Sequence, residues 1–454
     1  MPRQYDALIL GAGNAGLSAA ETVRAAGLSV TVVEERDLGG TCPNRGCTPK
    51  KVLVAAAHSL HEIARAKVHC IKVGEPQLDW AALIDREKQL TRPIPQSIAR
   101  TLAERGVEII RGHAAFVAPN AVRVGQATVE ARHIVIATGS KPRQLSIEGA
   151  EHTITSDEVL SERKLPRDVV FIGGGVVALE FSHVYARAGA KVTVLEALPR
   201  LLQHLDQDAV GKLVGESERI GIALHTGVKV ERIEAIGDRL RVVYQGGGAE
   251  RFVEADRVVN GAGRIPNVDS LDLDTGKIAH DRERIIVDDY LRSKSNPAIY
   301  VAGDPLASPQ LSPLASYEGR IVGRNIVEGP RHKPDYAAIP SCVFTVPALA
   351  TVGLTEAAAK DKGIKVEVRI SDMSDWLSTR TYAETVAWAK ILIEPASDRI
   401  VGAHMVGHAG EELINFFTLG MKHGITASQV RDMVFAFPTF AATSEAWSRP
   451  AAAN

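Results

Sequence analysis

The chain has 454 residues, of which 45% are hydrophobic and 24% charged, and its formal net charge at pH 7 is −1. This length exceeds one ordinary core, so we expect two or three domains, and the near-neutral charge gives no general attraction to nucleic acid or to an anionic membrane. The sequence has no run of about twenty apolar residues, so no transmembrane helix is predicted. Four cysteines are too few for a disulfide-stapled secreted scaffold. We therefore expect a cytoplasmic protein, in which a disulfide is more often catalytic or sensing than structural.

The chain opens with a pattern typical of a dinucleotide-binding fold. A strand at residues 7–10 leads into Gly-Ala-Gly-Asn-Ala-Gly at 11–16, then a helix to about residue 26 and a strand at 30–33. The glycines let backbone amides approach a pyrophosphate at the helix start, and an acid about 20 residues further on accepts a hydrogen bond from a ribose. The candidate dinucleotide contacts are Gly11, Gly13, Gly16 and Glu34.

Two cysteines, Cys42 and Cys47, follow within the segment 39–51. In a regular helix their Cα atoms would lie about 7.5 Å apart along the axis, beyond the roughly 7 Å limit for a disulfide. If the thiols pair, the segment between them must be irregular, and Pro43 and Gly46 suit such a turn. The alternative is two buried cysteines in a loop.

A helix is expected to start just after this segment, at Thr48 and Pro49, which are favoured N-terminal residues. Cys47 would then lie beside a helix N-terminus, where the dipole and Lys50 favour its thiolate.

The dinucleotide pattern then recurs. A strand at 169–172 leads into a second glycine run at 173–175, followed by a helix to about residue 188 and a strand at 191–195 that is closed by Glu196. Ala178 occupies the third glycine position, which is an accepted variant. Two nucleotide folds flanking a dithiol indicate an electron relay, and the second set of candidate contacts is Gly173, Gly175 and Glu196.

The remaining segments read as mixed α/β structure. We expect a helix over 80–105 interrupted near its two prolines, strands at 134–137, 298–302, 342–345 and 387–393, and a helix over 411–420. The sequence contains no metal-ligand cluster, and residues 450–454 are expected to be a frayed tail.

These motifs resemble those of the FAD-dependent pyridine nucleotide–disulfide oxidoreductases, the group of glutathione reductase, dihydrolipoamide dehydrogenase and mercuric reductase. Further residues that carry the resemblance are the segments 137–139, 263–267 and 301–304. The Cys-x-Pro-Lys-Lys box is similar to the glutathione reductase branch. The resemblance implies an α/β homodimer with two Rossmann-like dinucleotide-binding domains and a C-terminal α+β dimerisation domain. The implied domains are FAD-binding at 1–150 and 266–332, NAD(P)-binding at 151–265, and interface at 333–454.

The resemblance also implies roles for single residues. Cys42 and Cys47 would form the redox disulfide, with Cys47 nearer the flavin, and Lys50 would lie beside flavin N5 with Glu180 as its partner. The alternative for Glu180 is an ordinary acid on a helix surface. The other cofactor-binding residues implied are Gly40, Thr41, Thr138, Gly139, Gly263, Arg264, Gly303, Asp304, Leu311 and Ser312.

The nicotinamide preference is predicted from the second fold. A carboxylate at Glu196 accepts from a free 2′-hydroxyl and repels a 2′-phosphate, and Arg200 is the only arginine near this turn. We therefore expect NADH rather than NADPH. Val176 stands where many relatives place a tyrosine, so the nicotinamide pocket is expected to be more open at rest.

The C-terminal segment departs from the family pattern. Relatives have His-Pro-Thr with a glutamate five residues past the histidine, whereas this chain places Phe437 and Ala442 at those positions. A positioned acid-base group typically contributes about 10²–10⁴-fold to rate, so turnover of glutathione disulfide is expected to be weak. Candidate substitutes are Glu445, His58, His61 and His404, although His58 and His61 are better explained as histidines on an exposed helix face and His404 as part of a structural turn.

The sequence therefore predicts an enzyme that passes electrons from NADH through FAD to the dithiol, and on to a small-molecule disulfide or another thiol-reactive acceptor. Phe437, Thr439 and Phe440 would shape an apolar substrate mouth from the neighbouring subunit. Two alternatives stay open. One is a metal-ion reductase similar to mercuric reductase, which shares the Phe-Pro but carries a C-terminal cysteine pair that this chain lacks. The other is a slow redox sensor.

Overall fold

The structure is a computed structural model that describes residues 3–281, 284–306 and 308–443. The chain divides into two compact units. The first comprises residues 1–52, 84–143 and 263–335, and the second comprises residues 53–83, 144–262 and 336–454. Each unit is compact and is assembled from three separate segments of the chain. Within the described ranges, no helix combines the length and the apolar character needed to cross a membrane.

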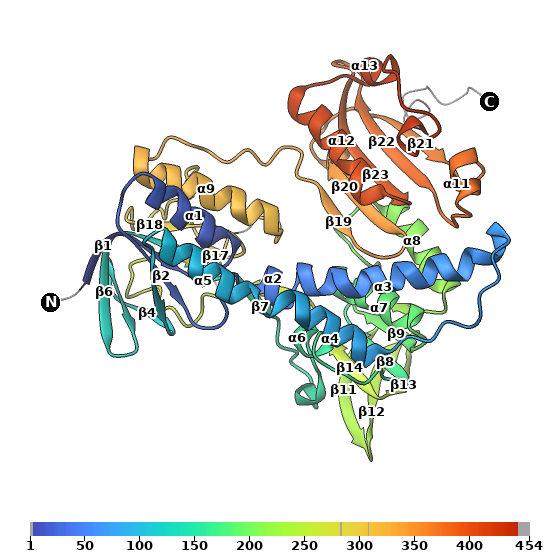
Figure 1. Cartoon of the computed structure of the whole chain (residues 1–454), viewed down its shortest axis with the longest axis horizontal. Coiled ribbons are helices and arrows are strands. Elements are labelled where there is room, and N and C mark those ends of the chain that lie inside the picture. The colour runs from blue at the N-terminus through green and yellow to red at the C-terminus, as the bar shows by residue number, and fades with distance from the viewer. Residues whose placement is uncertain (1–2, 282–283, 307, 444–454) are drawn as a thin grey trace. The chain divides into compact units, whose positions relative to one another are not determined.

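The first unit is built on a seven-stranded sheet in the order β3-β2-β1-β6-β5-β4, with β18 paired to β6. The strands β1, β2, β3, β6 and β18 pair in parallel, and buried Ala, Val, Ile and Leu side chains fill both faces around them. The helices α1 and α9 lie side by side in this unit (Figure 1). The bounds are β1 (Arg3–Leu10), α1 (Asn14–Ala25), β2 (Val30–Glu34), α5 (Ile94–Glu104), β3 (Glu108–Arg111), β4 (Ala114–Ala118), β5 (Ala121–Val124), β6 (Ala127–Ile136), β7 (Ser140–Pro142), β15 (Arg264–Pro266), β16 (His280–Asp281), β17 (Arg284–Ile285), β18 (Ile299–Val301) and α9 (Ser312–Glu328).

The dithiol segment forms a short helix, a break and a long helix: α2 (Thr41–Arg45), then Gly46, then α3 (Cys47–Arg65). The expected interruption between the cysteines is confined to Gly46, whose φ of −141° and ψ of −114° are not helical. The long helix begins one residue earlier than expected. The expected interruption of the next helix is confirmed, because α4 (Trp80–Thr91) ends before Pro93 and α5 follows it.

The second unit contains another parallel sheet, in the order β10-β9-β8-β14, and a three-stranded antiparallel sheet β11-β12-β13. Buried residues such as Val170, Leu195 and Val258 join the two sheets in one core. The bounds are α6 (Ser156–Val159), β8 (Asp168–Ile172), α7 (Val176–Arg187), β9 (Lys191–Glu196), α8 (Gln207–Arg219), β10 (Ala223–Thr226), β11 (Lys229–Ile236), β12 (Arg239–Gly246), β13 (Ala249–Ala255) and β14 (Arg257–Asn260).

The C-terminal part of the second unit is an antiparallel five-stranded sheet in the order β19-β20-β23-β22-β21, with α12 packed against β20 and β23. The predicted fold class, two nucleotide-binding folds and a C-terminal α+β domain, is confirmed. The bounds are β19 (Ser341–Val343), β20 (Ala348–Gly353), α10 (Glu356–Asp361), β21 (Glu367–Asp372), α11 (Leu377–Thr381), β22 (Trp388–Glu394), β23 (Arg399–Gly407), α12 (Gly410–His423) and α13 (Ala427–Arg431).

Candidate functional site

The first glycine run lies between β1 and α1 and has the shape of a phosphate cradle. Gly11 adopts φ +103°, and a methyl group there would lie 2.4 Å from the carbonyl oxygen of Ala137. A methyl group at Gly13 would meet only Gly40, at 3.9 Å, so the packing of the protein does not require glycine at this position. The open face at Gly13, at the start of a 12-residue helix, suits close approach of a pyrophosphate.

Two further features of the first unit fit a dinucleotide. Both oxygens of the buried Glu34 accept backbone amides, from Ala12 and Arg36, each at 2.8 Å, which leaves lone pairs for a ribose hydroxyl. The hydroxyl of Thr138 is buried and has no hydrogen-bond partner. A buried unsatisfied polar atom calls for an explanation, and a bound FAD supplies one. The residues present therefore fit the expected cofactor.

Asp304, Ser140 and Arg264 form a polar chain at the carboxyl ends of the same sheet. Ser140 Oγ donates to Asp304 Oδ2 at 2.5 Å, and Arg264 Nε donates to Ser140 Oγ at 3.0 Å. The amide of Gly303 donates to Glu318, a fully buried acid of α9, at 2.8 Å. The structure therefore brings Asp304 and Arg264 together, and sequence reasoning did not foresee Ser140 as the link.

Cys42 and Cys47 are both thiols in this structure and hydrogen-bond to each other. The bond from Cys47 lowers the pKa of Cys42 to about 6, although burial opposes the shift, and donors from Ser312 and Asn14 lower it further. The bond to Cys42, together with burial, raises the pKa of Cys47. The hydrogen bond between the two thiols therefore shifts their pKa values in opposite directions.

The expectation that Cys47 is the favoured thiolate stays a prediction. Cys47 stands at the start of α3, where Lys50 and Ser312 act to lower its pKa, whereas the hydrogen bond to Cys42 and burial act to raise it. Asn14 was not identified from the sequence as a neighbour of the dithiol. Its only signal was its place as the first residue of α1, directly after Gly13.

Lys50 and Glu180 are both buried, with 9% and 5% of their surfaces exposed. Glu180 lies on α7, and its Oε1 accepts the backbone amide of Phe344 at 2.8 Å. This burial is inconsistent with an acid on a helix surface. The pairing of Lys50 with Glu180 stays a prediction.

The second glycine run repeats the geometry of the first. Gly173 has φ +103°, Glu196 Oε2 accepts from the amide of Gly174 at 2.5 Å, and Glu196 Oε1 accepts from Leu198 at 2.7 Å. A methyl group at Gly175 would meet only a carbonyl oxygen, at 3.9 Å. Val176, the first residue of α7, is 40% exposed. These residues fit a second dinucleotide.

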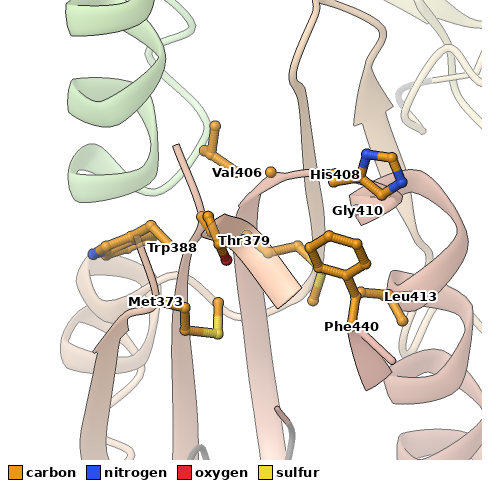
Figure 2. Close-up of a pocket in the computed structure, with 11 residues that line it drawn as sticks. Met373, Thr379, Trp388, Val406, His408, Gly410, Leu413 and Phe440 are labelled. Carbon is orange, nitrogen blue, oxygen red and sulfur yellow. The ribbon is translucent and has the colours of Figure 1, made fainter. Parts of the chain in front are cut away.

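The expected substrate-mouth residues lie in the segment that follows α13. Phe437 is 78% exposed, whereas Thr439 is engaged locally, donating to the carbonyl of Ala436 at 2.7 Å and accepting the amide of Ala442 at 3.1 Å. Phe440 faces a cavity of about 30 Å³ in the C-terminal domain (Figure 2). That volume is enough for one or two water molecules. Its other labelled walls are Met373, Thr379, Trp388, Val406, His408, Gly410 and Leu413.

A histidine cluster, comprising His58, His61 and His408, surrounds the buried carboxylate of Glu384. His408 Nδ1 lies 2.8 Å from Glu384 Oε1, and Arg65 Nη1 lies 2.9 Å from Glu384 Oε2. Burial opposes ionisation of Glu384, but the hydrogen bond with His408 and the close contacts with His61 and Arg65 outweigh it and lower its pKa. The hydrogen bond to Glu384 in turn raises the pKa of His408, which stacks on Phe440 with ring centroids 4.6 Å apart.

Several expectations about histidines need correction. His61 is 3% exposed, so it does not lie on an exposed helix face. His404 lies within β23 rather than in a turn, is fully buried and bonds to Thr351, which supports a structural role. His58 lies eleven residues from Cys47 on one helix, about 16 Å along the axis, so it cannot exchange a proton directly with that sulfur. Glu445 and the expected tail lie outside the described residues.

Comparisons with known proteins agree on one family. Residues 5–319 match the family described as "Pyridine nucleotide-disulphide oxidoreductase", and residues 339–447 match its dimerisation domain. A mercuric reductase of Bacillus cereus is 31% identical over 96% of this chain and 70% of its own length. A glutathione reductase of Burkholderia cepacia is 32% identical over 96% of this chain and 97% of its own. The solved Cu(II) complex of the HOCl-induced flavoprotein disulfide reductase RclA from Escherichia coli is 27% identical, with a TM-score of 0.88 over 99% of both chains.

Proposed function

This chain belongs to the pyridine nucleotide–disulphide oxidoreductase family, and we propose that it uses NADH to reduce the Cys42–Cys47 pair, which then reduces an external thiol-reactive acceptor. The chain is a flavoprotein oxidoreductase that uses FAD and a pyridine nucleotide and has a redox-active disulfide centre. The dimerisation domain supports a homodimer. The acceptor, the choice of NADH and the roles of single residues are the proposed parts.

The residues proposed to hold FAD are those of the first cradle: Gly11, Gly13, Gly16, Glu34, Gly40, Thr41, Thr138, Gly139, Gly303, Asp304, Leu311 and Ser312. When bound, FAD supplies the transfer of electrons from nicotinamide to the disulfide. Lys50 provides a buried positive charge for the flavin side of the dithiol, and Glu180 is proposed as its partner. The expected cytoplasmic location stays a prediction.

The nicotinamide is proposed to bind the second cradle, at Gly173, Gly175 and Glu196. The carboxylate of Glu196 is held by two backbone amides, so it is fixed at the end of β9, where a 2′-phosphate would be repelled. Gly263 and Arg264 are the remaining residues assigned to cofactor binding.

The dithiol is proposed to work by thiol–disulfide exchange. The Cys42 thiolate attacks one sulfur of an external disulfide, forms a mixed disulfide and releases the first product as a thiolate. Cys47 then gives its proton to a product thiolate and attacks the Cys42 sulfur, which releases the second product. The pair loses two electrons in forming its own disulfide, and the acceptor gains them.

The replacement of histidine by Phe437 is the observation that carries the choice of acceptor. Phenylalanine cannot protonate a leaving thiolate, so we propose acceptors whose leaving group is stable without a proton, such as aromatic disulfides of low thiol pKa. Phe437 is exposed and Phe440 is apolar, and with Thr439 they are proposed to form the mouth that receives such acceptors.

A second candidate function is reduction of a thiol-reactive metal ion. One relative is a mercuric reductase, and one structural neighbour was solved as a Cu(II) complex. Reduction of a metal ion releases no group that needs a proton, so the absence of an acid at Phe437 would not hinder it. Two Cu(II) ions would take one electron each from the two thiolates, giving two Cu(I) ions and the disulfide.

The deciding experiment measures NADH oxidation with an aromatic disulfide, glutathione disulfide, Cu(II), Hg(II) and oxygen. We expect the aromatic disulfide to exceed glutathione disulfide by about 10²-fold or more in kcat/KM. Phe437→His should raise turnover of glutathione disulfide, and Phe437→Leu is the matched control.

Each contrary result identifies a different error. Rapid turnover of glutathione disulfide by the unmodified enzyme would contradict the proposed acceptor class. Higher kcat/KM for a metal ion than for every disulfide would favour the second candidate. Turnover with oxygen alone would support the slow redox sensor.

A further inference from the structure

We propose that His408, held by Glu384, is a positioning residue that anchors Phe440 and thereby fixes the mouth segment, residues 434–443, in the conformation that receives the acceptor. This inference rests on the proposed function, because it explains what supports the residues proposed to form the mouth. All the residues of the anchor belong to the second unit.

Two aromatic side chains attach the mouth segment to the C-terminal domain. Phe435 packs against the apolar core of that domain, and its ring centroid lies 6.0 Å from that of Phe416. Phe440 stacks on His408, with ring centroids 4.6 Å apart and ring planes inclined by 24°. Phe437 lies between these two attachments and is 78% exposed. The position of Phe437 therefore depends on both attachments.

Neither hydrogen bond of the Thr439 hydroxyl attaches the segment to the domain. The hydroxyl donates to the carbonyl of Ala436 and accepts the amide of Ala442, so both bonds lie within the segment and set its local shape. His408 and Phe440 both line the cavity of about 30 Å³ (Figure 2). Atoms that face a void lose packing contacts on that side, so the stack with His408 matters more for holding Phe440 in place.

The attachment at Phe440 has a polar base, whereas the attachment at Phe435 is apolar. His408 Nδ1 lies 2.8 Å from Glu384 Oε1, and the Glu384 side chain is 2% exposed. Arg65 Nη1 lies 2.9 Å from the other carboxylate oxygen, so Glu384 is held from two sides. The ring of Tyr382 lies 5.2 Å from that of His408 and 5.5 Å from that of Phe440. The buried carboxylate therefore orients the His408 ring within a cluster of three rings.

The charges around His408 favour its protonated form. The hydrogen bond to Glu384 raises the pKa of His408 against the effect of burial, and Glu62 acts in the same sense, whereas Arg65 opposes it. The ring of His58 lies 6.5 Å from that of His408, and burial lowers the pKa of His58. The other ionisable groups that α3 and the first turn of α12 bring to this region are His61, Glu411 and Glu412.

The anchor is therefore expected to weaken as the pH rises. A cation within about 6 Å of a ring centroid is attracted to the face of the ring, and a neutral imidazole lacks that attraction. Because the pKa of His408 is raised above its unfolded value of about 6.5, the stabilisation is fully present below about pH 6.5 and is lost as the pH rises through the raised value. An acceptor that binds only the anchored segment then binds more weakly, in proportion to the anchored fraction.

The test compares variants at the same pH, so that the titration of the dithiol cancels. His408→Gln is neutral at every pH, and His408→Arg carries a permanent charge that can pair with Glu384 and stack on Phe440. The measured quantity is kcat/KM, with saturating NADH, for an aromatic disulfide that has no titrating group between pH 5.5 and pH 9. From pH 5.5 to pH 9, the ratio of the unmodified enzyme to His408→Gln should fall about fivefold, and the ratio of His408→Arg to the unmodified enzyme should rise about fivefold. The values of kcat should not follow these ratios.

Matched variants separate the anchor from a general effect. His423→Gln removes an exposed histidine of the same domain, and its ratio to the unmodified enzyme should not change with pH. In a Phe440→Leu background, the His408→Gln ratio should also lose its pH dependence, because the ring that His408 holds is absent.

Two results would overturn the proposal. One is a pair of ratios, for His408→Gln and His408→Arg, that stay constant from pH 5.5 to pH 9. The other is a pH-dependent loss of kcat at unchanged KM, because it would show that His408 transfers protons and does not position the segment. If His408→Arg fails to fold, the His408→Gln ratio alone decides between these outcomes.

Hydrogen exchange separates this proposal from the proposed function. The backbone amides of peptides that cover residues 434–443 are followed by mass spectrometry in the holoenzyme, without nicotinamide or acceptor. At pH 5.5 the unmodified enzyme should exchange more slowly than His408→Gln, and the difference should shrink toward pH 9. That result in a protein that reduces no disulfide would support the anchor and contradict the proposed function. Turnover of aromatic disulfides with identical exchange in both proteins at every pH would do the reverse.

Discussion

The two nucleotide folds of this chain use the same backbone geometry to different ends. Gly11 and Gly173 have the same φ of +103°, and the helices α1 and α7 both have 12 residues and begin after a glycine in extended conformation. Glu34 and Glu196 each accept two backbone amides. The two cradles therefore share their backbone geometry and the anchoring of their carboxylates.

The helices α1 and α7 differ in the residues that they present to neighbouring segments. The first residue of α1 is Asn14, whose side chain donates to Ser312 of α9, whereas the equivalent residue of α7 is Val176, which is exposed. The face of α1 against α9 is made of small residues. The helix α7 instead presents Glu180, His183 and Arg187 to the backbone of residues 344–346. One duplicated frame thus supports redox chemistry in one copy and a polar attachment to the C-terminal domain in the other.

The largest expected effect comes from the third glycine position, where the folds differ. Gly16→Ala would place a methyl group 1.9 Å from the carbonyl oxygen of Gly11. This overlap with the backbone cannot be relieved by a side-chain movement, so we expect the cradle to distort and flavin to be lost. The flavin absorbance per protein chain measures this directly. A fully yellow Gly16→Ala protein would show that the two cradles are more alike than their glycines suggest.

Removing the carboxylate that anchors the second fold should produce the next largest effect. Glu196→Ala leaves the amides of Gly174 and Leu198 without their acceptor, and hydrogen bonds to charged groups contribute about 1.5–3 kcal/mol each. We expect kcat/KM for NADH to fall about 10- to 100-fold and the value for NADPH to fall less, with flavin content unchanged. An NADPH advantage in the unmodified enzyme would contradict the proposed preference.

The polar face of α7 predicts a pH effect that α1 does not share. Burial lowers the pKa of His183 to about 3, against about 6.5 in an unfolded chain. As pH falls below about 6.5, the unfolded chain takes up a proton that the folded protein refuses, so stability is lost as pH falls toward 3. Between pH 7.5 and pH 5 this group alone should remove about 2 kcal/mol from the free energy of unfolding.

His183→Asn tests this effect because asparagine can still accept the Val346 amide, which bonds to His183 Nδ1 at 3.4 Å. The variant should be less stable at pH 7.5, because it loses the hydrogen bond between His183 Nε2 and Ser217 Oγ at 2.9 Å, but it should lose less stability on acidification. Urea midpoints at the two pH values measure the difference. Equal losses in both proteins would show that His183 is not the group responsible.

The smallest effect is expected from the opposite substitution at the matching position of the second fold. Ala178→Gly gives the second fold the glycine of the first, and no atom of the protein requires a methyl group there. We expect a loss of about 1 kcal/mol, from helix propensity and the lost methyl contact, with nicotinamide KM unchanged. Thermal unfolding of the holoenzyme measures it. A loss as large as that of Gly16→Ala would end the distinction between the two folds.

Local sequence patterns predicted the frame of the site well. Strand, glycine run, helix, strand and acid occurred in order twice, and the structure has β1, α1 and β2 and then β8, α7 and β9 within a few residues of the expected bounds. Such a unit is specified locally, because each turn requires particular backbone angles and each strand requires apolar residues. Prolines likewise located the break between α4 and α5.

The sequence alone determined the cradles, the dithiol and the absence of the C-terminal histidine, because each depends on residue type at short spacing. The tertiary structure decided which side chains surround the dithiol, because Ser312 lies 270 residues beyond Cys42 and comes near it only through the crossing of α9 with α1. It also decided that His61 and Glu384 are buried together. Burial arises from contacts between distant segments, and no local pattern encodes it.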